Sequence, residues 1–210
     1  MLFNILFNGS GDFLTNLVLF LMVAIALVVC ISIHEFSHAY IADRLGDPTA
    51  RMLGRVTLDP KAHLDPTGTM LLLLVGFGWG KPVPFDPRNL ENPKRDAAII
   101  SLAGPVSNIL LAVVLALIFQ VLNLSPLSFF GFFLGLTVRY NLILAIFNLI
   151  PVHPLDGFKV VNGILPQELS YQWIQMAPYG LWILLFLIFA GVTDRIIFPL
   201  LNTSLTFLGF

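Results

Sequence analysis

The sequence predicts an all-α polytopic membrane protein. We expect about four full transmembrane helices, a short re-entrant segment and small β-strands in a loop on the cytoplasmic side. Of the 210 residues, 57% are hydrophobic and only 11% are charged, whereas a soluble domain carries roughly a quarter charged residues. Several apolar segments reach the about 20 residues that a helix needs to cross a bilayer. At this length, residues 1–210 are expected to form a single domain.

The spans are predicted from apolar length and from residues that end helices. The first begins near Phe13 and can continue as a helix to Leu45, where Gly46 is expected to end it. The other spans are expected over about residues 97–122, over about residues 130–150 with Pro151 as the stop, and over about residues 179–200.

Between the first two spans lies a polar region with one apolar piece. This piece, MLLLLVGFGWG (residues 70–80), is short and glycine-rich, so it is interpreted as a buried or re-entrant segment. The stretches TARMLGRVTLDP and KPVPFDPRNL combine alternation with Pro or Gly. They are predicted to be short strands or extended loops.

Charge predicts the orientation in the membrane. Eight of the eleven Lys and Arg residues fall between Arg44 and Arg95, so this region is expected to be cytoplasmic. Alternation of the spans then returns residues 147–157 to the same side. We therefore expect a multi-pass protein of the cell membrane, surrounded by lipid, with its site toward the cytoplasm. The net charge of −1 predicts no nucleic-acid partner, and a single cysteine, Cys30, excludes a disulfide framework.

The sequence HEFSH (residues 34–38) carries the chemistry. On a helix, His34 and His38 lie on one face at positions i and i+4 and can bind one zinc ion, with Glu35 as general base for its water. The alternative is a pair of hydrogen-bonded histidines with Glu35 in a structural ion pair. Because polar groups in or beside a span need strong partners, zinc is favoured.

A third protein ligand is expected for a catalytic zinc. Asp156 is favoured because it follows the third span in FNLIPVHPLDG, at the predicted depth of HEFSH. His153 is the local rival. Asp156 can also be an N-cap of the next helix.

These residues resemble the site-2 proteases, zinc metalloproteases that cut substrates within the membrane. The likeness rests on HEFSHAYIADRLGD and FNLIPVHPLDG, with AGPVSN and GWGKPVP between them. The resemblance is to a compact form of the family, without a PDZ or nucleotide-sensing module, since about ten residues follow the last predicted span.

The resemblance implies a role for each residue of the site. It makes His34, His38 and Asp156 the ligands of one Zn²⁺ and Glu35 the catalytic base. It also implies that Asn148 steadies the oxyanion, against the alternative of an interhelical hydrogen bond. For Asn108 and Asn141 on their apolar helices, the interhelical bond is the better interpretation.

The predicted function is an intramembrane zinc endopeptidase that acts on membrane proteins with a transmembrane helix. Gly76 and Gly78 are candidates for substrate binding, because a glycine-rich edge allows an extended substrate to pair as a strand. The alternative for them is a turn that packs against the spans. A zinc transporter and a non-catalytic zinc-binding scaffold remain the competing functions. Both leave Glu35 without a clear task.

Overall fold

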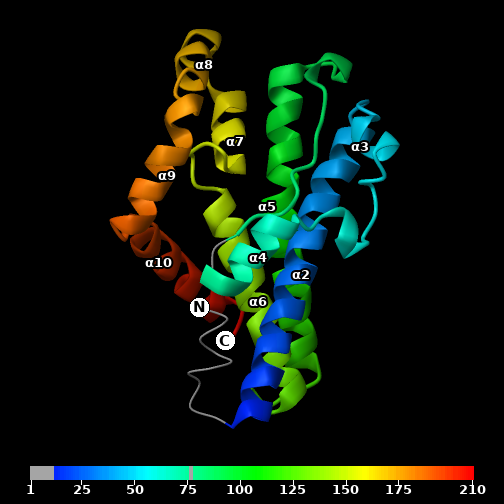
Figure 1. The fold of residues 1–210 in the computed structure, drawn as a ribbon, viewed down its shortest axis with the longest axis vertical. Coiled ribbons are helices and arrows are strands. Elements are labelled where there is room, and N and C mark those ends of the chain that lie inside the picture. The colour runs from blue at the N-terminus through cyan, green and yellow to red at the C-terminus, as the bar shows by residue number, and fades with distance from the viewer. Residues whose placement is uncertain (1–11, 76–77) are drawn as a thin grey trace.

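The protein is mainly helical, and three of its helices are long and apolar enough to cross a membrane. The computed structural model describes residues 12–75 and 78–210. The three helices are α2 (Phe13–Arg44), α5 (Pro93–Val121) and α6 (Phe129–Asn148) (Figure 1). They correspond to the first three predicted spans, which are thereby confirmed.

Local chemistry explains where these helices begin and end. The side chain of Asp12 accepts a hydrogen bond from the backbone N–H of Thr15 at 2.9 Å and caps the start of α2. Ser128 caps α6 in the same way through the N–H of Gly131. After α2, Gly46 adopts a φ of +105°, a conformation that a side chain disfavours. The predicted stop at Gly46 is therefore correct.

The fourth predicted span is not one continuous helix. It is divided into α9 (Gly180–Phe189) and α10 (Val192–Phe207). The break lies at Gly191, whose φ of +67° ends a right-handed helix. The segment that can supply a fourth span is instead the pair of α8 (Gln167–Ile174) and Ala177–Phe189, bent by 67°.

The polar region after α2 contains short helical elements and extended loops. No strand is found in residues 12–75 and 78–210, so the predicted small β-strands are not confirmed; one isolated antiparallel bridge joins Leu64 and Gly80. Pro82 and Pro84 follow Gly80 and supply no N–H, so a ladder cannot continue there. The helical elements are α3 (Thr49–Met52), η1 (Pro60–Ala62), α4 (Pro66–Val75) and η2 (Pro87–Asn89).

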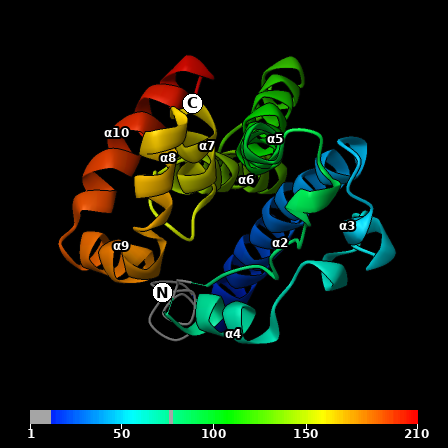
Figure 2. The same cartoon turned by 90° about the horizontal axis from the view of Figure 1, so that it is seen from above.

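Helix α5 lies at the centre of the molecule and contacts α2, α6 and α7 (Asp156–Ile164) (Figure 2). Ala112 and Ala116 on α5 are buried against Val138 and Leu142 of α6. Their small side chains allow close packing of the helices. Leucine and valine side chains elsewhere on α5 are exposed, as a lipid-facing surface requires. These exposed residues include Leu110, Val114 and Leu117.

Candidate metal centre

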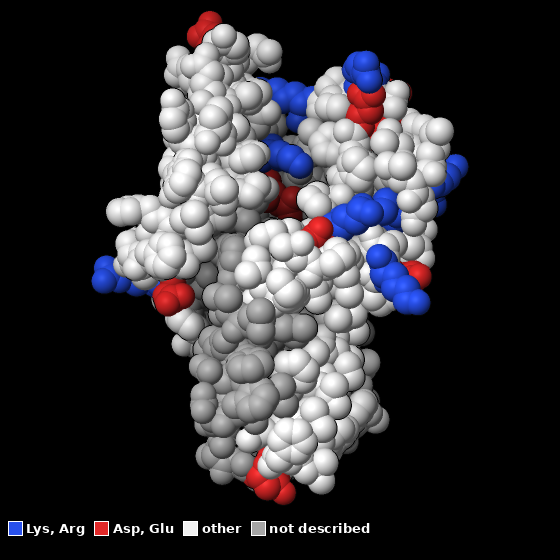
Figure 3. Space-filling view, in the orientation of Figure 1, with Lys and Arg blue, Asp and Glu red and all other residues white. Residues whose placement is uncertain are grey.

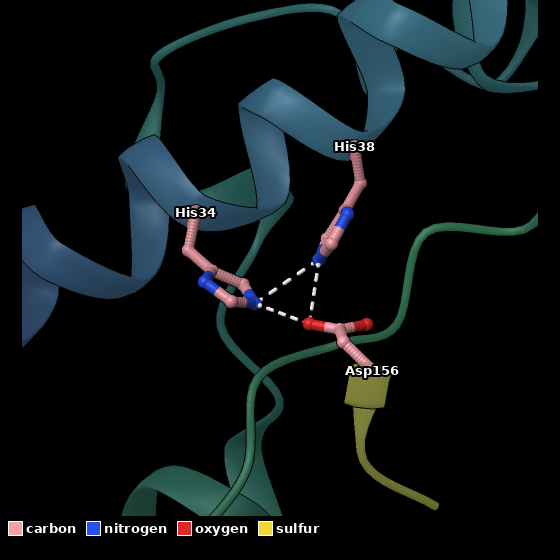
Figure 4. Close-up of side chains that lie close together, drawn as sticks. All are labelled: His34, His38 and Asp156. Atoms are coloured by element: carbon pink, nitrogen blue, oxygen red, sulfur yellow. Dashed lines mark hydrogen bonds and ion pairs between the residues drawn. The ribbon is translucent and has the colours of Figure 1, made fainter. Parts of the chain in front are cut away.

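Three side chains from two distant segments converge on one point. His34 and His38 project from the same face of α2, and Asp156 projects from the start of α7 (Figure 4). The Nε2 atoms of the two histidines lie 3.0 Å apart, and each lies 3.1 to 3.2 Å from Oδ2 of Asp156. These ligand atoms form the one group in the described residues whose spacing can hold a metal ion.

Hydrogen bonds on the far side of each ring determine what faces the centre. Nδ1 of His34 lies 2.7 Å from Oδ1 of Asn108, and Nδ1 of His38 lies 2.7 Å from the carbonyl oxygen of Ile100. Both partners lie on α5. A carbonyl oxygen only accepts, so Nδ1 of His38 carries the proton and its Nε2 lone pair points toward Asp156.

The donor set fits zinc. A tetrahedral ion with ligands at about 2.0–2.1 Å separates its ligand atoms by roughly 3.3 Å, close to the distances found between His34, His38 and Asp156. Burial raises the pKa of the Asp156 carboxyl, but its contacts with the two histidines outweigh burial and hold that pKa well below its usual range. Because the Nδ1 side of each ring is already hydrogen-bonded, the two Nε2 atoms and the carboxylate form a donor set that a divalent cation would bridge.

Glycines let the surrounding chain approach the centre. A Cβ on Gly104, in α5, would lie 2.5 Å from Nε2 of His38 and 2.6 Å from Cε1 of His34. A Cβ on Gly157 would lie 2.3 Å from the carbonyl oxygen of Leu149. Without a side chain, α7 can fold back tightly against the end of α6. The glycines of AGPVSN and PLDG are therefore steric requirements of the site.

Glu35 lies beside an extended segment that follows α4. A Cβ on Gly80 would lie 3.1 Å from Oε1 of Glu35. The segment is held by Arg55, whose guanidinium donates to the carbonyls of Lys81 and Pro82. Burial lowers the pKa of Arg55, and the negative charge of Glu35 acts in the opposite direction. The roles of Gly80 and Arg55 were not among the predictions from the sequence. The run of glycines in GFGWG was the sequence signal that could have indicated Gly80, whereas no local pattern marks Arg55.

Within the part of the chain that the structure describes, the remaining candidates make no hydrogen bond to the three ligand side chains. The amide of Asn148 donates to the carbonyl oxygen of Leu144 at 3.0 Å, which is a bond within α6 and not an interhelical one. His153 stacks edge-on against Phe158 instead of joining the cluster. Burial and the charge of Lys159 lower its pKa. Gly78 precedes the bridge at Gly80, and Gly76 lies outside the described residues.

Comparisons with known proteins show which family the chain belongs to. The sequence model of the family described as "Peptidase family M50" matches residues 22–129, a stretch that includes HEFSH and AGPVSN. The chain belongs to peptidase family M50, the family of the site-2 proteases. A Bacillus subtilis protein named "Putative zinc metalloprotease YwhC" is 36% identical over 187 residues, covering 86% of this chain and 85% of the relative.

Less similar relatives carry similar names. "Putative zinc metalloprotease Rip2" of Mycolicibacterium smegmatis is 28% identical over 90% of this chain and 75% of its own length. "Zinc metalloprotease MJ0392" of Methanocaldococcus jannaschii is 25% identical over 75% of this chain and 38% of its own length. No solved structure matches the chain with significance. The chain is a multi-pass membrane zinc metalloprotease whose family implies Zn²⁺.

Proposed function

We propose that this metalloprotease hydrolyses peptide bonds in or near transmembrane segments of membrane proteins, with His34, His38 and Asp156 as zinc ligands and Glu35 as general base. The observation that carries the proposal is the position of the ligands on a spanning helix. At about 1.5 Å per residue, His34 lies about 32 Å along α2 from Phe13. This distance is close to the thickness of a hydrocarbon core, about 30 Å.

The residues of the site have complementary tasks. When bound, zinc acts as a Lewis acid that makes water nucleophilic at neutral pH. Glu35 follows the first ligand on α2, takes a proton from the attacking water and returns it to the leaving amine. Asn148 donates its amide to the developing oxyanion once its bond to Leu144 is released.

The segment around Gly80 is suited to hold an extended substrate next to Glu35. The N–H of Lys81 donates to the carbonyl of His63 at 2.7 Å. In an extended chain the N–H and C=O of successive residues point to opposite sides. Because the N–H of Lys81 points toward His63, the N–H and C=O of Gly80 point away from it. A substrate strand that pairs there would lie against Glu35, and Gly78 would extend the same edge.

The proposed site opens toward the cytoplasm. Charged side chains gather over the upper part of the face shown in Figure 3, whereas the described surface below them is mostly white, with acidic atoms at its bottom end. Between the arm formed by α7, α8 and α9 and the side formed by α2 and α3, the surface is hollowed (Figure 3). Basic side chains lie along the hollow, and acidic side chains lie at its floor. Water can approach the centre by this route.

The test uses the purified full-length protein in detergent with a synthetic transmembrane peptide as substrate. Wild type is expected to bind one equivalent of zinc and cut the peptide, and Glu35→Gln is expected to bind zinc without cutting it. Glu168→Gln, the same change on the exposed surface of α8, serves as control. Cleavage that survives Glu35→Gln would refute the assignment of the base, and zinc flux into vesicles that survives it would favour a transporter.

Orientation is tested by labelling cysteines in whole cells, because the one native cysteine, Cys30, is buried. Arg88→Cys, at a position whose side chain is 87% exposed, should react with an impermeant maleimide only after the cells are permeabilised. Leu127→Cys, 96% exposed in the turn between α5 and α6, should react in intact cells. The opposite pattern would reject a cytoplasmic site.

A further inference from the structure

A row of buried amides leads from α6 through α5 to the proposed zinc ligand His34. Asn141 donates from Nδ2 to the carbonyl oxygen of Thr137 at 2.8 Å. Asn108 donates from Nδ2 to Oδ1 of Asn141 at 2.8 Å and to the carbonyl oxygen of Cys30 at 3.1 Å. Oδ1 of Asn108 then lies 2.7 Å from Nδ1 of His34. Both asparagines are 0% exposed, so water does not replace these partners.

The partners of Asn108 determine which way its amide points. Its nitrogen carries two hydrogens, and acceptors take both of them. The oxygen must therefore face His34, and since that oxygen cannot donate, Nδ1 of His34 carries the proton. The other ring nitrogen, Nε2, keeps its lone pair and points toward Asp156.

Asn141 holds Asn108 in this orientation. Because Nδ2 of Asn141 is engaged by Thr137, its oxygen is the atom presented to Asn108. If Asn141 were reversed, two amide nitrogens would face each other, and Asn108 would gain by reversing as well. A reversed Asn108 would donate to Nδ1 of His34 and move the ring proton to Nε2, where it would compete with a metal ion.

The two histidines differ in this respect. Nδ1 of His38 is bonded to a backbone carbonyl, that of Ile100, which has no second orientation. Nδ1 of His34 is bonded to a side chain that could point either way. The tautomer of His34 therefore depends on distant side chains, whereas that of His38 does not. A bond whose only task was to join α5 and α6 would not require a particular amide orientation.

We propose that Asn141 and Asn108 are positioning residues that hold His34 in the tautomer with the proton on Nδ1 and the lone pair of Nε2 available to zinc. Neither residue touches the metal or the substrate. The inference rests on the proposed function in one respect, that His34 is a zinc ligand. Partners of this kind typically contribute 10- to 100-fold to metal affinity.

The test measures zinc affinity by competition with a chelator on the purified full-length protein. Asn141→Leu removes the acceptor and is expected to weaken zinc binding about 10- to 100-fold. Asn141→Asp keeps an oxygen facing Asn108 and is expected to retain most of the affinity. Asn141→Ala removes the same acceptor without added bulk and replaces the leucine variant if that variant does not fold.

Gln120→Leu is the matched control. It removes another side-chain hydrogen bond between α5 and a distant segment, the bond from Nε2 of Gln120 to the carbonyl oxygen of Leu208. Gln120 lies near the end of α5, far along this helix from Asn108. It is expected to leave zinc affinity unchanged. Excess zinc should restore cleavage to Asn141→Leu, because the proposed defect lies in metal binding and not in the proton transfer by Glu35.

The outcomes separate the relay, which is the chain of hydrogen bonds from Asn141 through Asn108 to His34, from the metal site. If wild type binds zinc and His34→Ala abolishes this binding, but Asn141→Leu and Asn141→Ala bind zinc like wild type, the relay is refuted and the site stands. Equal losses in Asn141→Asp and Asn141→Leu would also refute the relay. If wild type binds no zinc, or His34→Ala binds it unchanged, both the site and the relay are rejected.

Discussion

The substitution Gly104→Ala tests how closely α5 must approach the metal centre. The added Cβ would lie 2.5 Å from Nε2 of His38 and 2.6 Å from Cε1 of both His34 and His38. Ordinary van der Waals contact begins at 3.4 Å, so the rings or the helix must move by about 0.9 Å. The rings cannot simply swing away, because Ile100 and Asn108 on the same helix hold their Nδ1 atoms.

This displacement should disrupt the site while leaving the helix intact. A shift of about 1 Å can cost about 100-fold in rate, and misplaced ligands lose about 10- to 100-fold in metal affinity. By propensity alone, alanine favours a helix over glycine by about 1 kcal/mol. We therefore expect Gly104→Ala to remain helical by circular dichroism, to bind zinc about 10- to 100-fold more weakly in chelator competition, and to cleave more slowly.

Gly135→Ala provides the control on α6. The nearest atoms to its added Cβ are Cε1 and Cδ1 of Phe210, at 3.2 and 3.8 Å, and this terminal side chain can move. Zinc affinity and cleavage should remain those of wild type. If Gly104→Ala also bound zinc and cleaved like wild type, the close packing of α5 against the ligands would be wrong.

Three further predictions concern the polar region and the metal. Asp47→Ala removes the acceptor for Thr49, Asn89 and the N–H of Asp86; we expect it to lower the free energy of unfolding by about 2–3 kcal/mol, measured by denaturant titration. Burial raises the pKa of Asp47 but these bonds outweigh it and lower the pKa below its usual value, so the contribution is present at neutral pH and is lost as the pH falls through the lowered pKa. Arg55→Lys should slow cleavage about tenfold at unchanged zinc affinity, because an ammonium cannot bridge the carbonyls of Lys81 and Pro82 as a guanidinium does. Unchanged cleavage would show that the segment around Gly80 does not depend on this contact. Removing zinc with a chelator should lower the unfolding temperature of wild type, since an ion at about 1,000 times its Kd stabilises by about 4 kcal/mol, and should not change that of Asp156→Ala.

Some features of this protein follow from local sequence patterns. The first three spans are visible as apolar length, and the i, i+4 spacing of His34 and His38 places both rings on one face of α2 whatever the rest of the chain does. Gly46 ends this helix because few other residues tolerate its φ of +105°. Asp156 was found by its place after the third span. The structure brings it to within 3.2 Å of both histidines.

Other features depend on how the helices cross, which no local pattern records. Asn108 was expected to bond between helices, and it does so with Asn141, but its second task of holding His34 appears only when α2 and α5 are packed together. The fourth span was predicted over about residues 179–200, which crosses the break at Gly191, because apolar composition does not reveal that break.

The apolar and charge patterns by themselves determined that this chain lies in a membrane and carries half of a zinc site on one helix. Only the tertiary structure decided which backbone lies against that site. Gly80 faces Glu35 and Gly104 faces His38 because separate segments meet there; an added Cβ would be tight at Gly80, 3.1 Å from Glu35, and would clash at Gly104, 2.5 Å from His38. Helical periodicity is a property of neighbouring residues, whereas these contacts join residues from 45 to 66 positions apart in the sequence.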